Sequence, residues 1–223
     1  MIDKFKNKKV LIAIPSYSGS FPSLMVESLL QLKKPIQCGF SVIDRQRIDK
    51  CRNFFVKQAL DGGFDYLFMV DDDNPIPPET LEKLLEGDKD IITVPILSRN
   101  PIEGGEYPMC AFYREDRKIK KKTIPYYIPI KKFKEGGYLH KIDAAGTGCI
   151  LIKRKVLEKI SKEYEYPFEF GDITVEGQRR TMSEDAEFSE RAVKCGFEIW
   201  LDESIVPVHI GRSMLIKYNK EKI

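Results

Sequence analysis

The sequence contains no hydrophobic run that is long enough to cross a membrane. The apolar stretch near its start, residues 10–14, leads directly into Pro15. A membrane-spanning helix needs about 20 apolar residues, and a secretory leader needs a longer apolar core with a cleavage site behind it. We therefore expect no membrane anchor and take the cytoplasm as the default compartment.

Paired cysteines and a strong net charge are also missing. The net charge of +3 is too small to indicate nucleic-acid binding, so no nucleic-acid partner is expected. Lysines crowd only within residues 118–122 and 131–134, where we expect solvated loops. The cysteines lack the short paired spacings of a zinc cluster or a disulfide framework, and we expect reduced, mostly buried thiols at Cys38, Cys51, Cys110, Cys149 and Cys195.

What the sequence does have is an alternation of short apolar runs and helical periodicities. At 223 residues, with 42% apolar and 32% charged residues, the chain is typical of one globular domain. Continuous short apolar runs are typical of strands that are buried on both faces of a parallel sheet. In the first half we expect strands at residues 10–14, 37–43, 66–70 and 91–94, and helices at 24–32, 45–60 and 78–86. This order predicts a doubly wound α/β unit, which binds ligands beyond the carboxyl ends of its strands.

The second half of the chain is less regular. Glycine, proline, tyrosine and lysine dominate residues 98–137, which we interpret as an irregular, substrate-facing insert with one strand at 109–113. Beyond the insert we expect strands at 138–142, 149–153 and 205–208, and helices at 154–163 and 183–194, the second of them capped by Ser183. Residues 1–223 are thus predicted to form a single domain, with a nucleotide-binding half (1–97), an acceptor-side half (98–211) and a tail (212–223). The tail mixes apolar and basic residues, as in a frayed end or in a segment that meets a partner or a membrane surface.

Three consecutive aspartates, Asp71, Asp72 and Asp73, follow the apolar run of residues 66–70 directly. Like charges that lie this close repel one another unless a cation neutralises them. Alternate residues of an extended segment point the same way, so Asp71 and Asp73 are predicted to share a divalent ion while Asp72 faces elsewhere. Oxygen ligands suit magnesium or manganese. The alternative is an acidic turn in which Asp73 or Asn74 caps the following helix.

One of the two histidines, His209, stands at the exit of the predicted strand 205–208. Because imidazole binds manganese and other transition ions, His209 is a candidate third ligand of the aspartate site. A structural histidine is the alternative.

Three further groups are candidates for chemistry. Glu184 and Asp185 begin a helix and offer a carboxylate that could take a proton from an attacking hydroxyl, although acidic residues also stabilise helix starts. The turn Gly146, Thr147 and Gly148 would let a ligand approach the backbone closely, or it forms a tight hairpin. A guanidinium fork aimed at a diphosphate or an exposed helix face accounts for Arg45, Arg47 and Arg52.

Six segments of the chain together resemble glycosyltransferases of the A fold, especially the family-2-like group. In order, they read VLIAIPSYSG, RQRIDKCRNFFVKQAL, YLFMVDDDNPIPPETL, DAAGTGCILIKR, MSEDAEFSERAVKCGFEIWLD and VHIG. The resemblance covers most of the chain. It implies an α/β fold: a single Rossmann-like, nucleotide-diphospho-sugar transferase domain with a mixed, mostly parallel central sheet flanked by helices.

The resemblance also implies roles for individual residues. Asp71, Asp72 and Asp73 match the Asp-x-Asp signature, which in that family holds a divalent cation on the diphosphate of a UDP- or GDP-sugar. Glu184 and Asp185 match the family's catalytic pair, in which the aspartate is the general base of inverting members, and His209 matches a further metal ligand. The remaining matches are donor-side residues at Pro15, Tyr17, Asp44, Arg52, Asn53 and Asp72, and acceptor- or sugar-side residues at Gly146, Thr147 and Gly148.

The sequence departs from the family pattern in two places. The second strand ends in SVIDRQR where the family has a pair of acidic residues, and this puts the base- or ribose-binding role of Asp44 in doubt. The Gln-x-x-Arg-Trp motif of processive synthases is missing, with only a loose echo around Gln178. A transferase that adds one sugar therefore fits better than a processive one.

The sequence-based hypothesis is a metal-dependent transfer of a sugar from a nucleotide-diphosphate sugar to an acceptor hydroxyl, with Asp185 as base. A nucleotidyltransferase is one alternative, but it would normally carry a glycine-rich, basic loop after the first strand, and PSYSGSFPS has one glycine and no lysine or arginine. A non-catalytic sugar- or nucleic-acid-binding module is the other, with residues 126–134 as its aromatic and basic platform.

Overall fold

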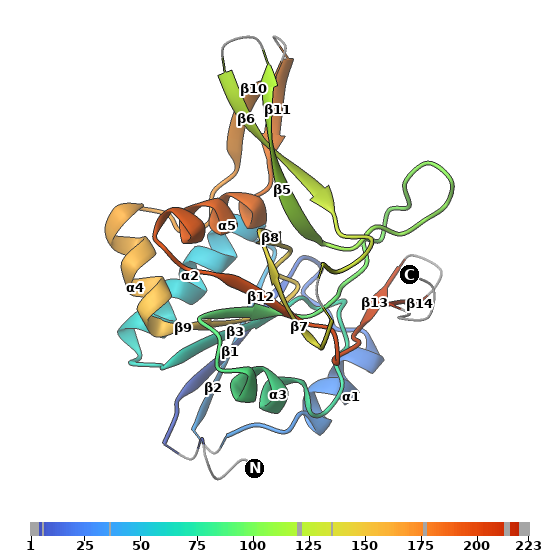
Figure 1. Cartoon of the computed structure of the whole chain (residues 1–223). Coiled ribbons are helices and arrows are strands. Elements are labelled where there is room, and N and C mark those ends of the chain that lie inside the picture. The colour runs from blue at the N-terminus through green and yellow to red at the C-terminus, as the bar shows by residue number, and fades with distance from the viewer. Residues whose placement is uncertain are drawn as a thin grey trace.

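The computed structural model describes residues 5, 7–35, 37–119, 122–134, 136–175, 178–211 and 215–218. Its centre is a seven-stranded sheet with the order β2-β1-β3-β9-β4-β12-β7 (Figure 1). All strands run in one direction except β9 and β7, so the sheet is mixed and mostly parallel, as predicted. The strands are β1 (Val10–Ser16), β2 (Cys38–Asp44), β3 (Tyr66–Val70), β4 (Ile91–Thr93), β7 (Leu139–Ile142), β9 (Cys149–Lys153) and β12 (Ile199–Asp202).

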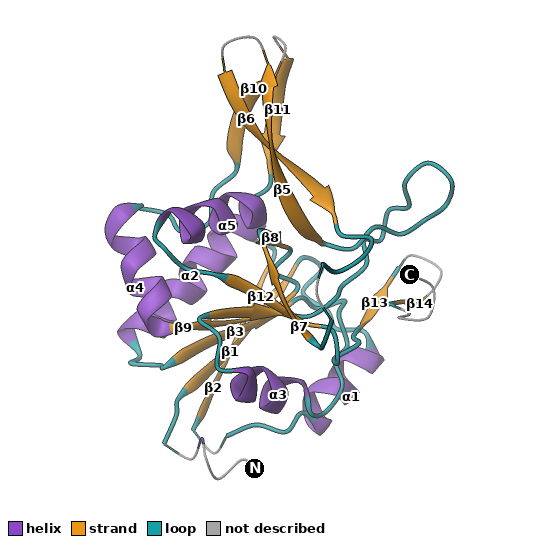
Figure 2. Ribbon diagram, in the orientation of Figure 1, coloured by secondary structure: helices purple, strands orange, loops and turns teal. Residues whose placement is uncertain are grey.

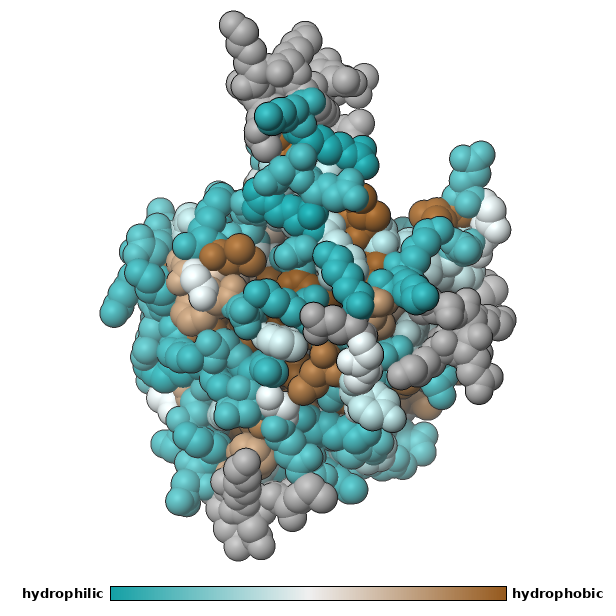
Figure 3. Space-filling model, viewed as in Figure 1, coloured by the Kyte–Doolittle hydropathy of each residue, from teal (hydrophilic) through white to brown (hydrophobic). Residues whose placement is uncertain are grey.

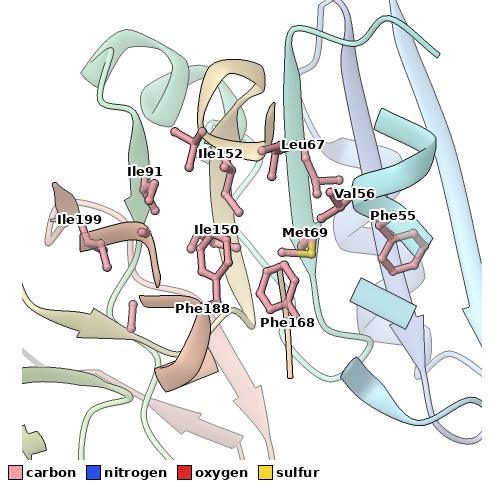
Figure 4. Close-up of a cluster of buried hydrophobic side chains, with 14 of the residues drawn as sticks. Phe55, Val56, Leu67, Met69, Ile91, Ile150, Ile152, Phe168, Phe188 and Ile199 are labelled. Atoms are coloured by element: carbon pink, nitrogen blue, oxygen red, sulfur yellow. The ribbon is translucent and has the colours of Figure 1, made fainter. Parts of the chain in front are cut away.

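Helices cover both faces of this sheet (Figure 2). One face carries α2 (Ile48–Asp61), α4 (Arg154–Glu163) and α5 (Glu184–Lys194), and the other carries α1 (Ser23–Gln31) and α3 (Thr80–Gly87). On the first face, the rings of Phe168 and Phe188 stack with centroids 4.3 Å apart, and Phe188 lies next to Ile150 of β9 (Figure 4). Fully burying an aromatic or aliphatic side chain contributes about 1.5–3 kcal/mol, so these two apolar layers stabilise the sheet that carries the site.

The position of Pro15 inside β1 has a simple explanation in the strand pairing. Proline cannot donate a ladder hydrogen bond and is confined to strand edges. β1 pairs with β3 only up to Ala13, whereas its pairing with β2 continues to Ser16. Pro15 therefore lies where one side of β1 is already free, and the strand ends two residues later than the sequence predicts.

The elements of the first half lie close to their predicted places, with one shifted start. The second helix begins at Ile48 and not at residue 45, because Arg45 has a φ of 52° and its backbone N–H donates to the carbonyl of Ser16. A left-handed residue cannot belong to a right-handed helix. The chain uses Arg45 to turn away from the sheet edge.

The prediction of an irregular insert at residues 98–137 is wrong. That segment contains a long hairpin, β5 (Ala111–Ile119) and β6 (Lys122–Pro129), which pairs at its base with β8 (Ala144–Ala145). A second hairpin, β10 (Gly171–Val175) with β11 (Gln178–Met182), also went unpredicted. Both project from the body of the molecule (Figure 1). Neither has the apolar alternation of a strand that lies on a core.

The end of the chain also differs from the prediction. Residues 205–207 form no strand; the strand here is β13 (Val208–Ile210), which pairs with β14 (Leu215–Lys217) outside the central sheet. The segment 215–218 of the predicted tail is packed, because Ile216 and Tyr218 are buried and the Tyr218 hydroxyl donates to Glu203.

The surface is mostly polar, with small scattered apolar patches on the face shown in Figure 3. None of the helices in the described ranges is both long and apolar enough to span a bilayer. All five cysteines are free, and Cys51 and Cys149 are buried.

Candidate active site

The aspartate turn lies at the carboxyl edge of the central sheet, directly after β3. The backbone N–H of Asp71 donates to the carbonyl of Gly148 at 2.9 Å, and that of Asn74 donates to the carbonyl of Asp71 at 3.1 Å. The aspartates thus occupy a tight turn, and the expected extended segment is wrong. The capping alternative is wrong as well, because α3 begins at Thr80 after Glu79.

The three carboxylates nevertheless point to different neighbours. Asp71 faces Arg52, whose Nη2 lies 3.3 Å from its Oδ1. Asp72 accepts a hydrogen bond from the hydroxyl of Ser16, at the end of β1. Asp73 lies against Arg99, with 2.7 Å between Nη1 and Oδ2. Asp71 and Asp73 each face an arginine, whereas Asp72 lies beside Ser16.

His209 reaches Asp73 from the far end of the chain. The backbone N–H groups of Val208 and Ile210 donate to the carbonyls of Pro75 and Asp73 at 2.9 and 2.8 Å, which fixes β13 alongside the aspartate turn. The ring atom Nδ1 of His209 lies 2.5 Å from the carbonyl oxygen of Leu97. Since a carbonyl can only accept, Nδ1 carries the proton. Nε2 then faces Asp73 Oδ1 across 3.5 Å.

A buried arginine holds Glu184 and Asp185, the pair predicted to be catalytic. Arg52 is 2% exposed, and its Nη1 donates to both Glu184 and Asp185. Asp185 also accepts from the hydroxyl of Thr147. Ser183 caps α5 as predicted, because its hydroxyl accepts from the N–H of Ala186 at 3.3 Å. The helix start thus presents Asp185 toward the aspartate turn and keeps Glu184 buried beneath it.

Burial raises the pKa of two of these carboxyl groups. Desolvation raises the pKa of Asp71 to about 6, against the lowering effect of Arg52. Desolvation and the neighbouring Asp185 raise the pKa of Glu184 to about 7. The same carboxylates raise the pKa of the Arg52 guanidinium, although burial opposes them. The cluster therefore holds more acid than its single cation neutralises, which favours an additional positive charge nearby.

A cavity of about 170 Å³ opens between these elements, lined by Asp71, Asn74, Ile96, Cys110, Phe112, Ala145, Gly146, Thr147, Gly148, Ser183, Asp185, Ala186 and His209. Whole small-molecule sites usually measure about 300–1,000 Å³. The volume suits one part of a ligand, with the remainder lying outside the cavity. The cavity joins the predicted metal, base and sugar-side residues in one place.

The interpretation of residues 146–148 as a tight hairpin is wrong. It connects β8 of the small sheet to β9 of the central sheet. A Cβ on Gly148 would lie 2.9 Å from the Asn74 amide, and one on Gly146 would lie 3.0 Å from Cys110. Gly148 thus lets the loop backbone lie close to the aspartate turn, and Gly146 lets it lie close to Cys110. Between them, the side chain of Thr147 reaches Asp185.

Four predicted donor-side residues, Pro15, Tyr17, Asp44 and Asp72, lie at the ends of β1 and β2 and in the aspartate turn. The last residues of β1 and β2, Ser16 and Asp44, are partners in the sheet, and Pro15 precedes Ser16. The turn after β1 bends back at Gly19, where a Cβ would lie 2.8 Å from Asp44, and it leaves Tyr17 90% exposed. The hydrogen bond between Ser16 and Asp72 joins this corner to the aspartate turn.

The structure does not bring Asn53 to the cavity. Its amide bonds both the N–H and the carbonyl of Phe168, at 3.0 and 2.6 Å. Arg47 pairs with Asp49, Arg45 approaches only Asp44 at 3.9 Å, and Arg52 is occupied by carboxylates. The predicted arginine fork on a diphosphate is therefore not assembled from these side chains.

The side chains predicted to hold a metal ion are those of Asp71, Asp73 and His209. Within the described ranges, no three His, Cys, Asp or Glu side chains form a cage for an ion. Magnesium, however, is commonly held by one or two carboxylates together with substrate phosphates. A ligating histidine usually donates its second ring N–H to a carbonyl or carboxylate, as His209 does with Leu97. Asp73 and His209, with Asp71 nearby, thus fit an ion that binds together with a diphosphate.

Sequence reasoning missed two residues of the site. Arg99 was not singled out because it falls at the start of the segment interpreted as an irregular insert. Ser16 lies at the end of a predicted strand, and only the pairing of β1 shows that its hydroxyl meets Asp72. No sequence motif marks either contact.

The raised pKa of Glu184 predicts a pH-dependent stability. A carboxyl that binds its proton more tightly in the folded state stabilises the fold below its unfolded pKa, and this contribution is lost as the pH rises through the folded pKa. As the pH rises from about 4.5 to 7, the free energy of unfolding should therefore fall by up to roughly 3 kcal/mol, because the contribution of Glu184 is lost. Glu184→Gln should flatten this fall, measured by urea unfolding across the range. An unchanged pH profile in the variant would contradict the assignment, and Glu187→Gln on the same helix is the control.

Comparison with known proteins gives a fold and no family. No protein-family model and no curated protein matches the sequence. The crystal structure of A197 from STIV is similar with a TM-score of 0.57 and 17% identity, over 95% of both chains. S. aureus TarS 1-349 gives 0.48 and 14%, over 88% of this chain and 60% of that one. UDP-glucose pyrophosphorylase complexed with UDP-glucose gives 0.44 and 7%, over 95% and 92%.

The last two TM-scores are too low to establish a shared fold. The likeness to A197 extends over nearly the whole of both chains, but its sequence identity is too low to carry an activity. It shows that the α/β architecture described above also exists in another protein.

Proposed function

We propose that this chain is a metal-dependent glycosyltransferase that moves a sugar from a nucleotide-diphosphate sugar to an acceptor hydroxyl. One observation carries the proposal. Asp71, Gly148, Asp185 and His209 come from four distant parts of the chain and line one cavity at the carboxyl edge of the sheet, where α/β folds bind their ligands. The donor-side corner at Pro15, Tyr17 and Asp44 adjoins it through Ser16 and Asp72.

Asp73 and His209, with Asp71, would hold a manganese or magnesium ion on the diphosphate. When bound, such an ion neutralises negative charge on a departing nucleoside diphosphate. The residues themselves do the positioning. β13 fixes His209 beside the turn, and the Leu97 carbonyl sets its tautomer so that Nε2 is the free ring nitrogen. Arg99 supplies a half-exposed cation at the carboxylate of Asp73.

Asp185 is the proposed general base of an inverting transfer. Its carboxylate is partly exposed to the cavity, so an acceptor hydroxyl that enters the cavity can reach it. Arg52 and Thr147 both donate to the same oxygen, Oδ1, so Oδ2 is the oxygen of Asp185 that would take the proton of an acceptor hydroxyl. Glu184, buried beneath, is proposed to position Arg52 and not to touch the substrate.

The alternative of a binding module has less support from the geometry. Its aromatic platform would be residues 126–134, but the Tyr127 hydroxyl donates to Glu190 and Arg117 lies 4.0 Å from the centroid of the Tyr126 ring. Both rings are engaged by the chain itself. The nucleotidyltransferase alternative still lacks a basic residue in the loop 16–22.

Calorimetric titration with UDP-, GDP-, dTDP- and CMP-sugars, with and without manganese, tests the proposal. We expect one nucleotide class to bind in a manganese-dependent way. Asp73→Ala should weaken that binding by at least about tenfold, since even indirect partners of a metal cost this much. Asp61→Ala, which removes an exposed carboxylate on α2, should change nothing. Failure of every sugar nucleotide to bind would favour the binding module instead.

A further inference from the structure

The central sheet ends at β2, whose outer edge is open. The carbonyl of Gln37 accepts from the N–H of Val10, and the N–H of Arg45 donates to the carbonyl of Ser16, both at 3.0 Å. Backbone groups of one strand residue point to the same side, so the odd-numbered residues bond β1. The N–H and C=O groups of Cys38, Phe40, Val42 and Asp44 therefore point outward, and within the described ranges no strand pairs with them.

The side chains of these same residues make one face of the edge apolar. Phe40 is 58% exposed and Val42 is 41% exposed. The opposite face of β2 is covered by α2 and its following turn, since the hydroxyl of Ser41 donates to Gln58 and Gly39 packs against the ring of Phe64. The exposed face lies on the side of the sheet that carries α1, a helix with its own exposed Leu24, Val26 and Leu30.

β2 has none of the features that normally keep an edge strand from pairing. Proteins protect open edges with lysine, proline, bulges or very short strands. The strand CGFSVID contains no lysine, arginine or proline, spans seven residues, and keeps an unbroken register with β1. An open edge of this kind is a template for another strand.

We propose that the outer edge of β2 pairs with β2 of a second copy of this chain, in an antiparallel, two-fold symmetric dimer. A register centred on Ser41 places Cys38 opposite Asp44 and Phe40 opposite Val42 of the partner. Every outward N–H and C=O of the strand then finds a partner, because the four outward residues form the hydrogen-bonded pairs of an antiparallel ladder. The strand is complementary to itself, as a two-fold interface requires.

Side chains and charges fit the same register. Each Phe40 meets a valine across the two strands, and aromatic pairs with β-branched residues stabilise antiparallel ladders. Lys34 lies close enough to Cys38 to lower the pKa of its thiol against the raising effect of burial. The half-exposed carboxylate of Asp44 would lie opposite that position in the partner. The pairing thus brings Lys34 and Asp44 of different copies together twice.

Sedimentation equilibrium over a wide range of protein concentration tests the proposal. We expect the wild type to approach twice the mass of one chain. Val42→Lys places a charge on the apolar face and should restore the monomer. Val193→Lys is the matched control, because Val193 is a valine of nearly equal exposure, 42%, on α5, and it should leave the dimer intact. Both variants are checked for unchanged urea unfolding of the monomer at low concentration.

Amide hydrogen exchange provides a readout at the edge itself. In the dimer, the N–H groups of Phe40 and Asp44 should exchange at least about tenfold more slowly than in the Val42→Lys monomer. A wild type that stays monomeric at all concentrations would overturn the proposal. So would a dimer that Val42→Lys leaves unchanged, since another surface would then be the interface.

Discussion

Asp185→Asn is expected to lower kcat for sugar transfer by about 10²–10⁴-fold, the usual contribution of a positioned general base, with donor affinity nearly unchanged. Asparagine keeps the shape of the side chain and can still accept from Arg52 and Thr147, but it cannot take a proton. Asp185 lines the cavity beside the aspartate turn, and its carboxylate is bonded by Arg52 and Thr147. The proton-accepting step should therefore be lost and the donor site kept.

The measurement is steady-state kinetics together with calorimetry of the donor, once the nucleotide class has been identified. Glu187→Gln serves as the control, because it lies on the same helix and pairs with Arg191, away from the cavity. An equal loss of kcat and donor affinity in Asp185→Asn would contradict the role of base. It would make Asp185 part of the donor site.

The sequence predicted the central sheet well because that sheet is buried. Strands β3 and β9 have almost uninterrupted apolar sequences, and their predicted bounds, 66–70 and 149–153, are those of the structure. The projecting hairpins could not be predicted in this way, since β5 is rich in charged residues and none of the four strands is a continuous apolar run. The four-residue strand β12, Ile199–Asp202, was not predicted.

Candidate site residues were predicted from the ends of elements: Asp71, Asp73 and His209 from strand ends and Asp185 from a helix start. The structure brings these four residues to one region. The prediction for Arg52 was wrong. The sequence placed this arginine on a diphosphate or on an exposed helix face, but its side chain is buried. Arg52 is buried against α5, whose Glu184 lies 132 residues further along the chain. No local sequence pattern predicts that contact. The same is true of Arg99 on Asp73.

Arg52→Met is expected to lower the free energy of unfolding by about 3–5 kcal/mol, as removal of one partner from a buried ion cluster generally does. Methionine is unbranched and apolar, and it can occupy much of the same space. It leaves the carboxylates of Asp71, Glu184 and Asp185 without the cation that all three share. The loss should then come from uncompensated charge and not from an empty volume.

This origin makes the effect depend on pH, with a definite sign. Without Arg52 the carboxylates hold their protons to a higher pH, so the variant should be penalised more at pH 8 than at pH 5. Adding Glu184→Gln removes one of the uncompensated charges and should recover part of the loss. Lys57→Met, on the same helix but 72% exposed in its pair with Asp61, should cost less than about 1 kcal/mol.

The measurement is urea unfolding at pH 5 and pH 8 of the wild type, Arg52→Met, Arg52→Met with Glu184→Gln, and Lys57→Met. If Arg52→Met cost no more than Lys57→Met, or the same at both pH values, the guanidinium would not be the counterion of the site, and the orientation of Asp185 would have to come from Thr147 alone.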